Sequence, residues 1–197
     1  MAYDGAPLWV LVDAKTGSLR YDPRTLRAGD ECLLSGAVYT LRDATARRLI
    51  DELRTKGSLP YGLSGQILFF AGPTPARGAS AVGSIGPTTA RRFDQATVEL
   101  MEAGIVATIG KGDRSPAVAE ACCQSGGVYL GALGGIAALL ARHVDSVKSV
   151  AYPELGCEAL MRVELDRFPV FVALDSRGGD WYRQAPTRFL TAMGVRS

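Results

Sequence analysis

The sequence predicts an α/β domain with mixed sheets, built in layers of strands and helices. In the middle of the chain, short apolar runs typical of buried strands alternate with segments of helical periodicity. Towards both ends, extended apolar runs follow one another more closely, which does not fit a purely doubly wound parallel fold. With 197 residues, the chain is long enough for one sizeable hydrophobic core and a small appendage.

The expected strands are short apolar or β-branched runs bounded by glycine, proline or small polar residues. They cover residues 8–12, 31–40, 66–71, 105–109, 128–130, 147–151, 159–165 and 170–175. The expected helices have one apolar face and recognisable start and stop signals. They cover residues 40–57, 88–104, 115–126 and 136–141, and a short docking helix is expected around Phe189, Leu190 and Met193. We expect Thr40 to cap the first helix, and Thr88 or Thr89 to cap the second, each through its hydroxyl.

Charge and hydropathy argue against nucleic-acid and membrane partners. The 22 basic and 20 acidic residues nearly cancel, and no run of Lys or Arg is present. The start of the chain shows no signal-peptide pattern, and the longest apolar stretch, residues 128–141, is too short to span a bilayer.

The four cysteines form no C-x-x-C pair, and the chain has a single histidine, His143. This cysteine pattern without a secretory signal predicts a reduced, cytoplasmic protein. The lone histidine argues against a histidine-based metal site or catalytic triad within this chain.

The stretch 83–94 is the most informative part of the sequence. It is a loop that turns directly into a helix, and Arg91 and Arg92 lie in the first turn. A helix start disfavours cations, but free N–H groups, two hydroxyls and guanidinium groups together form a site for a carboxylate or phosphate. An ordinary capped helix with solvated arginines is the alternative.

Two further motifs are candidates for chemistry. Lys111 lies between Gly110 and Gly112, after a strand and before a helix, which is where α/β folds bind ligands. This motif has the spacing of neither a P-loop nor a dinucleotide fingerprint, and a plain turn lysine is its alternative. Glu154 and Glu158 are a possible acid/base pair, with solvated or capping glutamates as the alternative.

Taken together, these motifs resemble the β subunit of class I, iron–sulfur-dependent hydro-lyases, namely two-subunit fumarase and L-tartrate dehydratase. Single-chain class I fumarases carry the same unit as their C-terminal domain. The resemblance covers roughly residues 7–182, and the matching segments occur in the family's order. They are residues 28–30, 35–36, 40–44, 71–73, 83–89, 109–112 and 154–159.

The resemblance implies a role for five residues. Arg42 matches the arginine of the family's Thr-x-Arg-Asp motif and Arg92 the arginine after Gly-Pro-Thr-Thr, and both are implied to clamp substrate carboxylates. Thr88 is implied to transfer a proton or position a hydroxyl, and Thr89 to bind substrate. Lys111 matches the lysine of Gly-Lys-Gly and is implied to be both catalytic and substrate-binding.

The resemblance also implies a swivelling β/β/α domain over residues 1–182 with a tail at 183–197. The implied reaction is reversible hydration of a small dicarboxylate, with fumarate and (S)-malate first and L-tartrate as the alternative. An α subunit is implied to carry a four-iron–four-sulfur cluster in an α2β2 assembly, while this chain binds no metal itself. A non-catalytic anion-binding or assembly module on the same fold is the competing hypothesis, and a hydro-lyase for a substituted dicarboxylate is a third.

Three departures from the family pattern bear on the substrate. Ala46 stands where the family often has histidine, Arg91 replaces a residue that is usually small, and Cys157 stands where methionine is common. These changes leave the expected reaction class intact and leave the substrate open.

Overall fold

The structure is a computed structural model that describes residues 8–11, 22–76 and 78–193. Its strands form one mixed sheet in the order β1-β2-β3-β4-β5-β7-β6. The strands are β1 (Leu8–Leu11), β2 (Glu31–Leu41), β3 (Ile67–Phe70), β4 (Ala107–Gly110), β5 (Val128–Gly131), β6 (Val144–Ala151) and β7 (Leu160–Leu174). The α-helices are α1 (Asp43–Lys56), α2 (Asp94–Glu102), α3 (Pro116–Ser125), α4 (Ala137–Leu140) and α5 (Trp181–Ala192). The 3₁₀ helices are η1 (Pro23–Thr25), η2 (Ala90–Phe93), η3 (Ala141–His143) and η4 (Pro153–Glu158).

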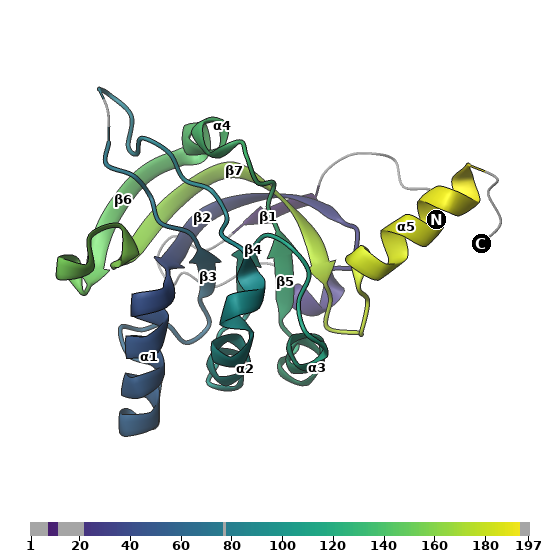
Figure 1. Cartoon of the computed structure of the whole chain (residues 1–197), viewed down its shortest axis with the longest axis horizontal. Helices are drawn as coiled ribbons and strands as arrows, with labels where there is room; N and C mark the ends of the chain where they lie inside the picture. The colour runs from purple at the N-terminus through teal and green to yellow at the C-terminus, as the bar shows by residue number, and fades with distance from the viewer. Residues whose placement is uncertain (1–7, 12–21, 77, 194–197) are drawn as a thin grey trace.

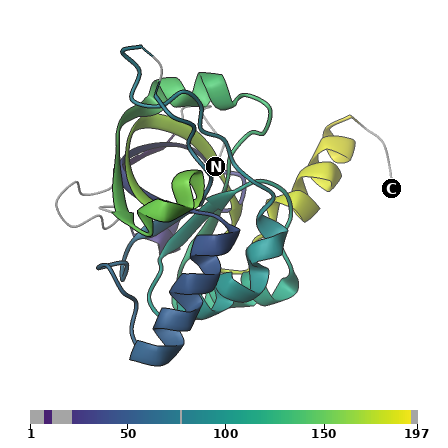
Figure 2. The same cartoon turned by 60° about the vertical axis from the view of Figure 1, so that its left-hand side comes forward.

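Strand β7 closes the sheet into a five-stranded barrel. Strands β1 to β5 pair in parallel, each with its neighbour in the sequence. Strand β7 then pairs antiparallel with β5 on one side and returns to pair antiparallel with β2, which completes the ring. Strand β6 adds to β7 outside the ring. In Figure 1, β2, β6 and β7 arch above β3, β4 and β5, and Figure 2 shows their curvature from a second side.

The parallel strands are apolar on both faces because each face meets a separate core. On β3, Ile67 and Phe69 point into the barrel, whereas Leu68 and Phe70 point out towards the helices. Helices α1, α2 and α3 lie side by side over that outer face (Figure 1). The alternation explains why the sequence shows continuous apolar runs at these strands instead of the polar–apolar pattern of a half-buried sheet.

The element types predicted from the sequence are largely confirmed. Helix α3 begins after Ser115 with Pro116 in its first turn and ends before Gly126, as expected from those residues. The expected helix over 88–104 is η2 followed by α2. The segments 159–165 and 170–175 are not separate strands: both belong to β7, which runs through the polar residues between them.

Two predicted features of the helices are wrong. Thr40 does not cap α1, because β2 continues through it and the helix starts after Arg42. The helix near the C-terminus begins at Trp181 and contacts the domain through Trp181 and Tyr182, whereas the residues expected to dock do not: Phe189 and Met193 are 64% and 65% exposed. Every helix in the described part of the chain is too short or too polar to cross a bilayer.

Candidate active site

The residues singled out from the sequence lie where parallel strands end. Arg42 follows the last residue of β2, and Lys111 follows Gly110, the last residue of β4. The turn containing Thr88 and Thr89 packs beside the end of β3. The carboxyl ends of parallel strands meet at one edge of a sheet, so these groups share the edge where α/β folds bind ligands.

Backbone hydrogen bonds hold the threonine turn between two strands. The Thr88 N–H donates to the carbonyl of Phe70 at 2.7 Å, and its hydroxyl donates to the same oxygen at 3.1 Å. The Lys111 N–H donates to Thr88 O at 3.1 Å, and the Ala90 N–H donates to Lys111 O at 2.9 Å. Thr89 therefore pairs with Lys111 as in a short parallel bridge. The position of this turn is fixed by main-chain contacts.

The predicted hydroxyl cap is not present in this turn. Thr89 is the N-terminal cap residue of η2, but its side chain makes no capping hydrogen bond, and it is exposed. Thr88 directs its hydroxyl back to β3 instead of forward along the helix. Both side chains lie at the carboxyl edge of the sheet, and neither hydroxyl caps η2.

Close packing at Gly110 brings the threonine turn onto β4. A Cβ atom at Gly110 would lie 2.7 Å from Ala90 Cβ and 3.1 Å from the Phe70 ring, so a larger residue there would separate the two loops. Phe93 stacks on Phe70 with ring centroids 4.6 Å apart, which fixes η2 over the end of β3. These contacts fix the backbone of η2 and therefore the point from which the Arg92 side chain extends.

Two tyrosines fix the loop that carries Lys111. The Tyr129 hydroxyl donates to Gly112 O at 2.9 Å, and the Gly112 N–H donates to the Tyr182 hydroxyl at 3.2 Å. Burial raises the pKa of both hydroxyls, so both stay protonated near neutral pH. The lysine side chain runs past Gly134, where a Cβ atom would lie 3.1 Å from Lys111 Cδ and 3.5 Å from Nζ.

Arg42 lies at the start of α1 and keeps an unsatisfied donor. Its Nε is buried, has no hydrogen-bond partner among the described residues, and lies 4.0 Å from Glu158 Oε1. Glu158 Oε2 accepts from the N–H of Ala44 at 2.9 Å, so this carboxylate caps α1. A buried guanidinium N–H without a hydrogen bond is costly, and the nearby Glu158 carboxylate offsets part of that cost.

The structure does not bring Glu154 and Glu158 together as an acid/base pair. Glu154 is exposed and forms an ion pair with Arg48, whereas Glu158 caps α1. The capping interpretation is therefore confirmed for Glu158.

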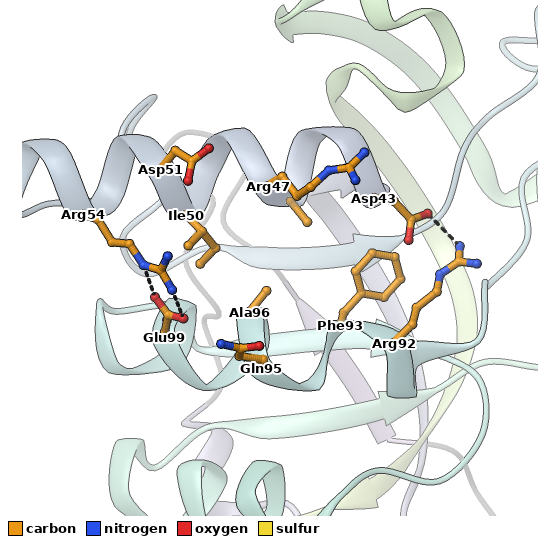
Figure 3. Close-up of a pocket in the computed structure, with 11 residues that line it drawn as sticks. Asp43, Arg47, Ile50, Asp51, Arg54, Arg92, Phe93, Gln95, Ala96 and Glu99 are labelled. Carbon is orange, nitrogen blue, oxygen red and sulfur yellow. Dashed lines mark hydrogen bonds and ion pairs between the residues drawn. The ribbon is translucent and has the colours of Figure 1, made fainter.

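Arg92 reaches from η2 towards the first turn of α1. Its Nη2 lies 3.1 Å from Asp43 Oδ2. Figure 3 shows this pair at one end of a groove between α1 and α2, with the ion pair of Arg54 and Glu99 at the other end. The groove has a volume of about 440 Å³. Arg42 precedes Asp43 directly in the chain, but Arg42, Thr88 and Lys111 are not among the residues that line this groove.

Sequence reasoning missed a buried ion pair that joins the two loops. Arg114 is 7% exposed, its Nε lies 2.6 Å from Asp94 Oδ1, and its Nη2 donates to the Thr97 hydroxyl at 2.7 Å. Its guanidinium carbon lies 5.4 Å from the centre of the Phe70 ring and 4.7 Å from that of Tyr129. In the sequence this arginine stands in a polar run after Lys111, where nothing distinguishes it from a solvated residue.

The described residues do not provide a site for a metal cluster. No group of three or more His, Cys, Asp or Glu side chains among them is placed to hold a metal ion. The four cysteines are free, with Cys32 and Cys122 buried and Cys123 and Cys157 exposed. An iron–sulfur cluster needs several thiolates converging on one point, so the residues that the structure describes do not fit one.

A family model described as Fumarase C-terminus matches residues 9–185 of this chain. The chain belongs to this family. The match confirms the resemblance drawn from the motifs at Arg42, Thr88 and Lys111, and it covers strands β2 to β7, all but the first residue of β1, and helices α1 to α4.

Two kinds of curated relative are similar to this chain. The "Fumarate hydratase class I, aerobic" of Escherichia coli K12 is 37% identical over 153 residues, which are 77% of this chain and 28% of the relative. The "L(+)-tartrate dehydratase subunit beta" of the same organism is 32% identical over 164 residues, 81% of this chain and 80% of the relative. A Methanocaldococcus jannaschii protein provisionally given that subunit name is 36% identical over 169 residues, 83% of this chain and 87% of the relative.

This chain therefore spans little more than a quarter of the fumarate hydratase and most of each β subunit. In length it corresponds to a subunit, or to one domain of the longer enzyme.

Proposed function

We propose that this chain is the β subunit of an iron–sulfur-dependent hydro-lyase that reversibly adds water to a small dicarboxylate. Fumarate and (S)-malate are the favoured pair, with L-tartrate as the alternative substrate. The observation that carries the proposal is the grouping of Arg42, Arg92 and Lys111 with two threonine hydroxyls at one sheet edge. Three cations suit a substrate with two negative charges, and family membership supports the same reaction class.

In this proposal the two arginines bind the two carboxylates. A guanidinium offers five N–H donors in a planar fork that matches a carboxylate. Arg42, whose side chain is 30% exposed, contributes guanidinium donors other than its buried Nε, and Arg92 contributes the donors that do not face Asp43. Both arise from backbone fixed by packing, so the substrate is oriented by groups that need little rearrangement.

Thr88, Thr89 and Lys111 are proposed to act at the reacting end of the substrate. The Thr88 proton points at Phe70 O, so the hydroxyl oxygen is left as an acceptor towards the substrate. Thr88 is the candidate for proton transfer or for positioning a hydroxyl, and Thr89 is the candidate for binding substrate. Lys111 supplies a positive charge from a loop held on both sides, which stabilises negative charge that develops during water loss.

The cluster is proposed to belong to an α subunit. The resemblance implies a four-iron–four-sulfur cluster for this reaction, and the described residues of this chain do not fit one. We propose an α2β2 assembly in which residues 1–182 form a swivelling β/β/α domain and residues 183–197 a tail. The cytoplasmic location stays a prediction from the cysteine content.

The test is anaerobic co-purification of this chain with a cysteine-bearing α subunit, followed by cluster reconstitution. Fumarate absorbance is then followed with malate, and oxaloacetate formation with each tartrate isomer. We expect turnover only when both chains and the cluster are present, and a loss of at least about 100-fold in kcat/KM for Arg92→Ala. Absence of a complex and of turnover with every dicarboxylate would favour the non-catalytic anion-binding or assembly module.

A further inference from the structure

We propose that Asp43 is a positioning residue that holds the Arg92 guanidinium in place for the substrate carboxylate. This inference rests on the proposed function, because it assigns a purpose to a residue that supports the arginine clamp. Asp43 itself is placed in contact with Arg92 and not with the substrate.

The contact joins two elements that come from distant parts of the chain. Asp43 is the first residue of α1, and Arg92 lies in η2. Their side chains meet with Arg92 Nη2 at 3.1 Å from Asp43 Oδ2, and each is about two-fifths exposed. Figure 3 shows them pointing towards each other across the end of the groove.

Arg92 needs such a partner because little else fixes its long side chain. Its guanidinium carbon lies 5.0 Å from the centre of the Phe93 ring, which restrains one face. Among the described residues, no other carboxylate forms an ion pair with it. An arginine with many accessible rotamers loses that freedom when it binds a ligand, unless an existing contact has already restricted it.

Asp43 is well suited to this task because its own position is determined by the helix. A carboxylate in the first turn of an α-helix is favoured by the partial positive charge at the N-terminus. Glu158 fixes the same turn by accepting from the Ala44 N–H. Asp43 therefore presents a fixed negative charge, and Arg92 aligns to it.

The ion pair also relates the two arginines of the clamp. Arg42 is the residue before α1 and Asp43 is its first residue, so one arginine stands at the helix start and the other is held there through Asp43. A dicarboxylate binds at both ends only when the spacing between the two guanidinium groups is right. The pair uses one nitrogen of Arg92, and the other N–H groups of its fork point elsewhere.

A merely structural role, in which the pair only ties α1 to η2, predicts different results. It would make Asp43 variants less stable without a specific loss of substrate affinity. The positioning role predicts a rise in KM that depends on Arg92 being present.

The experiment uses the reconstituted complex of this chain with its α subunit. The variants are Asp43→Asn, Asp43→Glu, Arg92→Ala and the double variant Asp43→Asn/Arg92→Ala. Asp51→Asn is the matched control, because Asp51 lies on the same helix, lines the same groove, and forms no ion pair among the described residues. The readouts are kcat, KM for the dicarboxylate, and the thermal midpoint of each variant.

We expect Asp43→Asn to lower kcat/KM by about 2- to 5-fold, mainly through KM, with Asp43→Glu recovering part of the loss. Asp51→Asn should match the wild type. In the Arg92→Ala background, Asp43→Asn should have no further effect, because its role passes through that arginine.

Four results would overturn the proposal. Unchanged kinetics of Asp43→Asn in an active complex would show that Arg92 needs no support, and so would losses that multiply independently in the double variant. If the fall in kcat/KM of Asp43→Asn equalled the fraction of that variant that is unfolded, the ion pair would only tie α1 to η2, which is the structural role. An inactive wild-type complex on every dicarboxylate would overturn the proposed function together with this inference, and would be distinguished by that inactivity.

Discussion

Two ion pairs near the site have the same length and opposite exposure, which allows a prediction about stability. Arg114 Nε lies 2.6 Å from Asp94 Oδ1, with side chains 0% and 13% exposed. Arg91 Nη1 lies 2.6 Å from Asp113 Oδ2, with side chains 60% and 62% exposed. The perturbation is the change Asp→Asn at Asp94, compared with the same change at Asp113.

Burial decides the size of the effect. Asp94→Asn leaves the Arg114 guanidinium buried without its counter-charge, which costs about 3–5 kcal/mol of unfolding free energy. It also weakens the cap of α3, because Asp94 Oδ2 accepts from the Ser115 N–H at 2.7 Å. Asp113→Asn removes an exposed, solvent-screened pair worth about 0–1 kcal/mol. For a chain of this size each kcal/mol moves the thermal midpoint by about 2–4 °C.

The assay is urea unfolding of the full chain at pH 7, followed by far-UV circular dichroism, with thermal scans as a second measure. We expect the midpoint to fall by about 6–20 °C for Asp94→Asn and by no more than about 4 °C for Asp113→Asn. Equal slopes against urea for all three proteins are needed for the comparison. If Asp94→Asn cost no more than Asp113→Asn, the buried pair would not be what holds the two site loops together.

Three further outcomes are expected. Burial alone raises the pKa of the Asp175 carboxyl, but three backbone N–H donors outweigh it and hold the pKa below its usual value. The resulting stability is present above about pH 4 and lost as pH falls through the folded pKa, so the unfolding free energy of Asp175→Asn should depend less steeply on acid than that of the wild type. In Gly72→Ala, the new Cβ would lie 2.7 Å from Arg42 Cδ and 2.9 Å from the backbone oxygen of Cys157, so KM should rise and the thermal midpoint should fall. A thiol reagent should label Cys123 and Cys157 quickly; burial raises the pKa of the other two thiols to about 12, so they should react only after unfolding.

Local signals in the sequence were enough to predict most elements. Ser115 and Pro116 mark the start of α3, and short apolar runs mark β3, β4 and β5, because those features act within a few residues. Local signals could not predict that the two expected strands at 159–165 and 170–175 form one continuous strand, β7. The polar residues in its middle look like a turn, and the strand continues there because β2 lies opposite Phe168 and Pro169.

In the candidate site too, the sequence indicates single residues but not the contacts between them. Arg42, Thr88, Arg92 and Lys111 stand in motifs, so the sequence indicates them directly. The contacts that organise them, such as Asp43 with Arg92, join segments that are far apart in the chain. Thr40 does not cap α1 because β2 continues to Leu41, one residue beyond it. Here strand pairing, a tertiary interaction, outweighs the local tendency of threonine to start a helix.

The pairing of β2 with β7 has a consequence for the order of folding. Thr40 lies opposite Met161, and Glu31 lies opposite Phe171, so more than half of the chain separates the paired residues. The parallel strands β2 to β5 can associate with their helices as they leave the ribosome, but the ring stays open until β7 has been synthesised. Until then β7 does not cover Phe69 and Ile109, whose side chains belong to the core inside the barrel. Barrel closure is therefore a late, long-range step, and the nascent chain exposes apolar surface until it occurs.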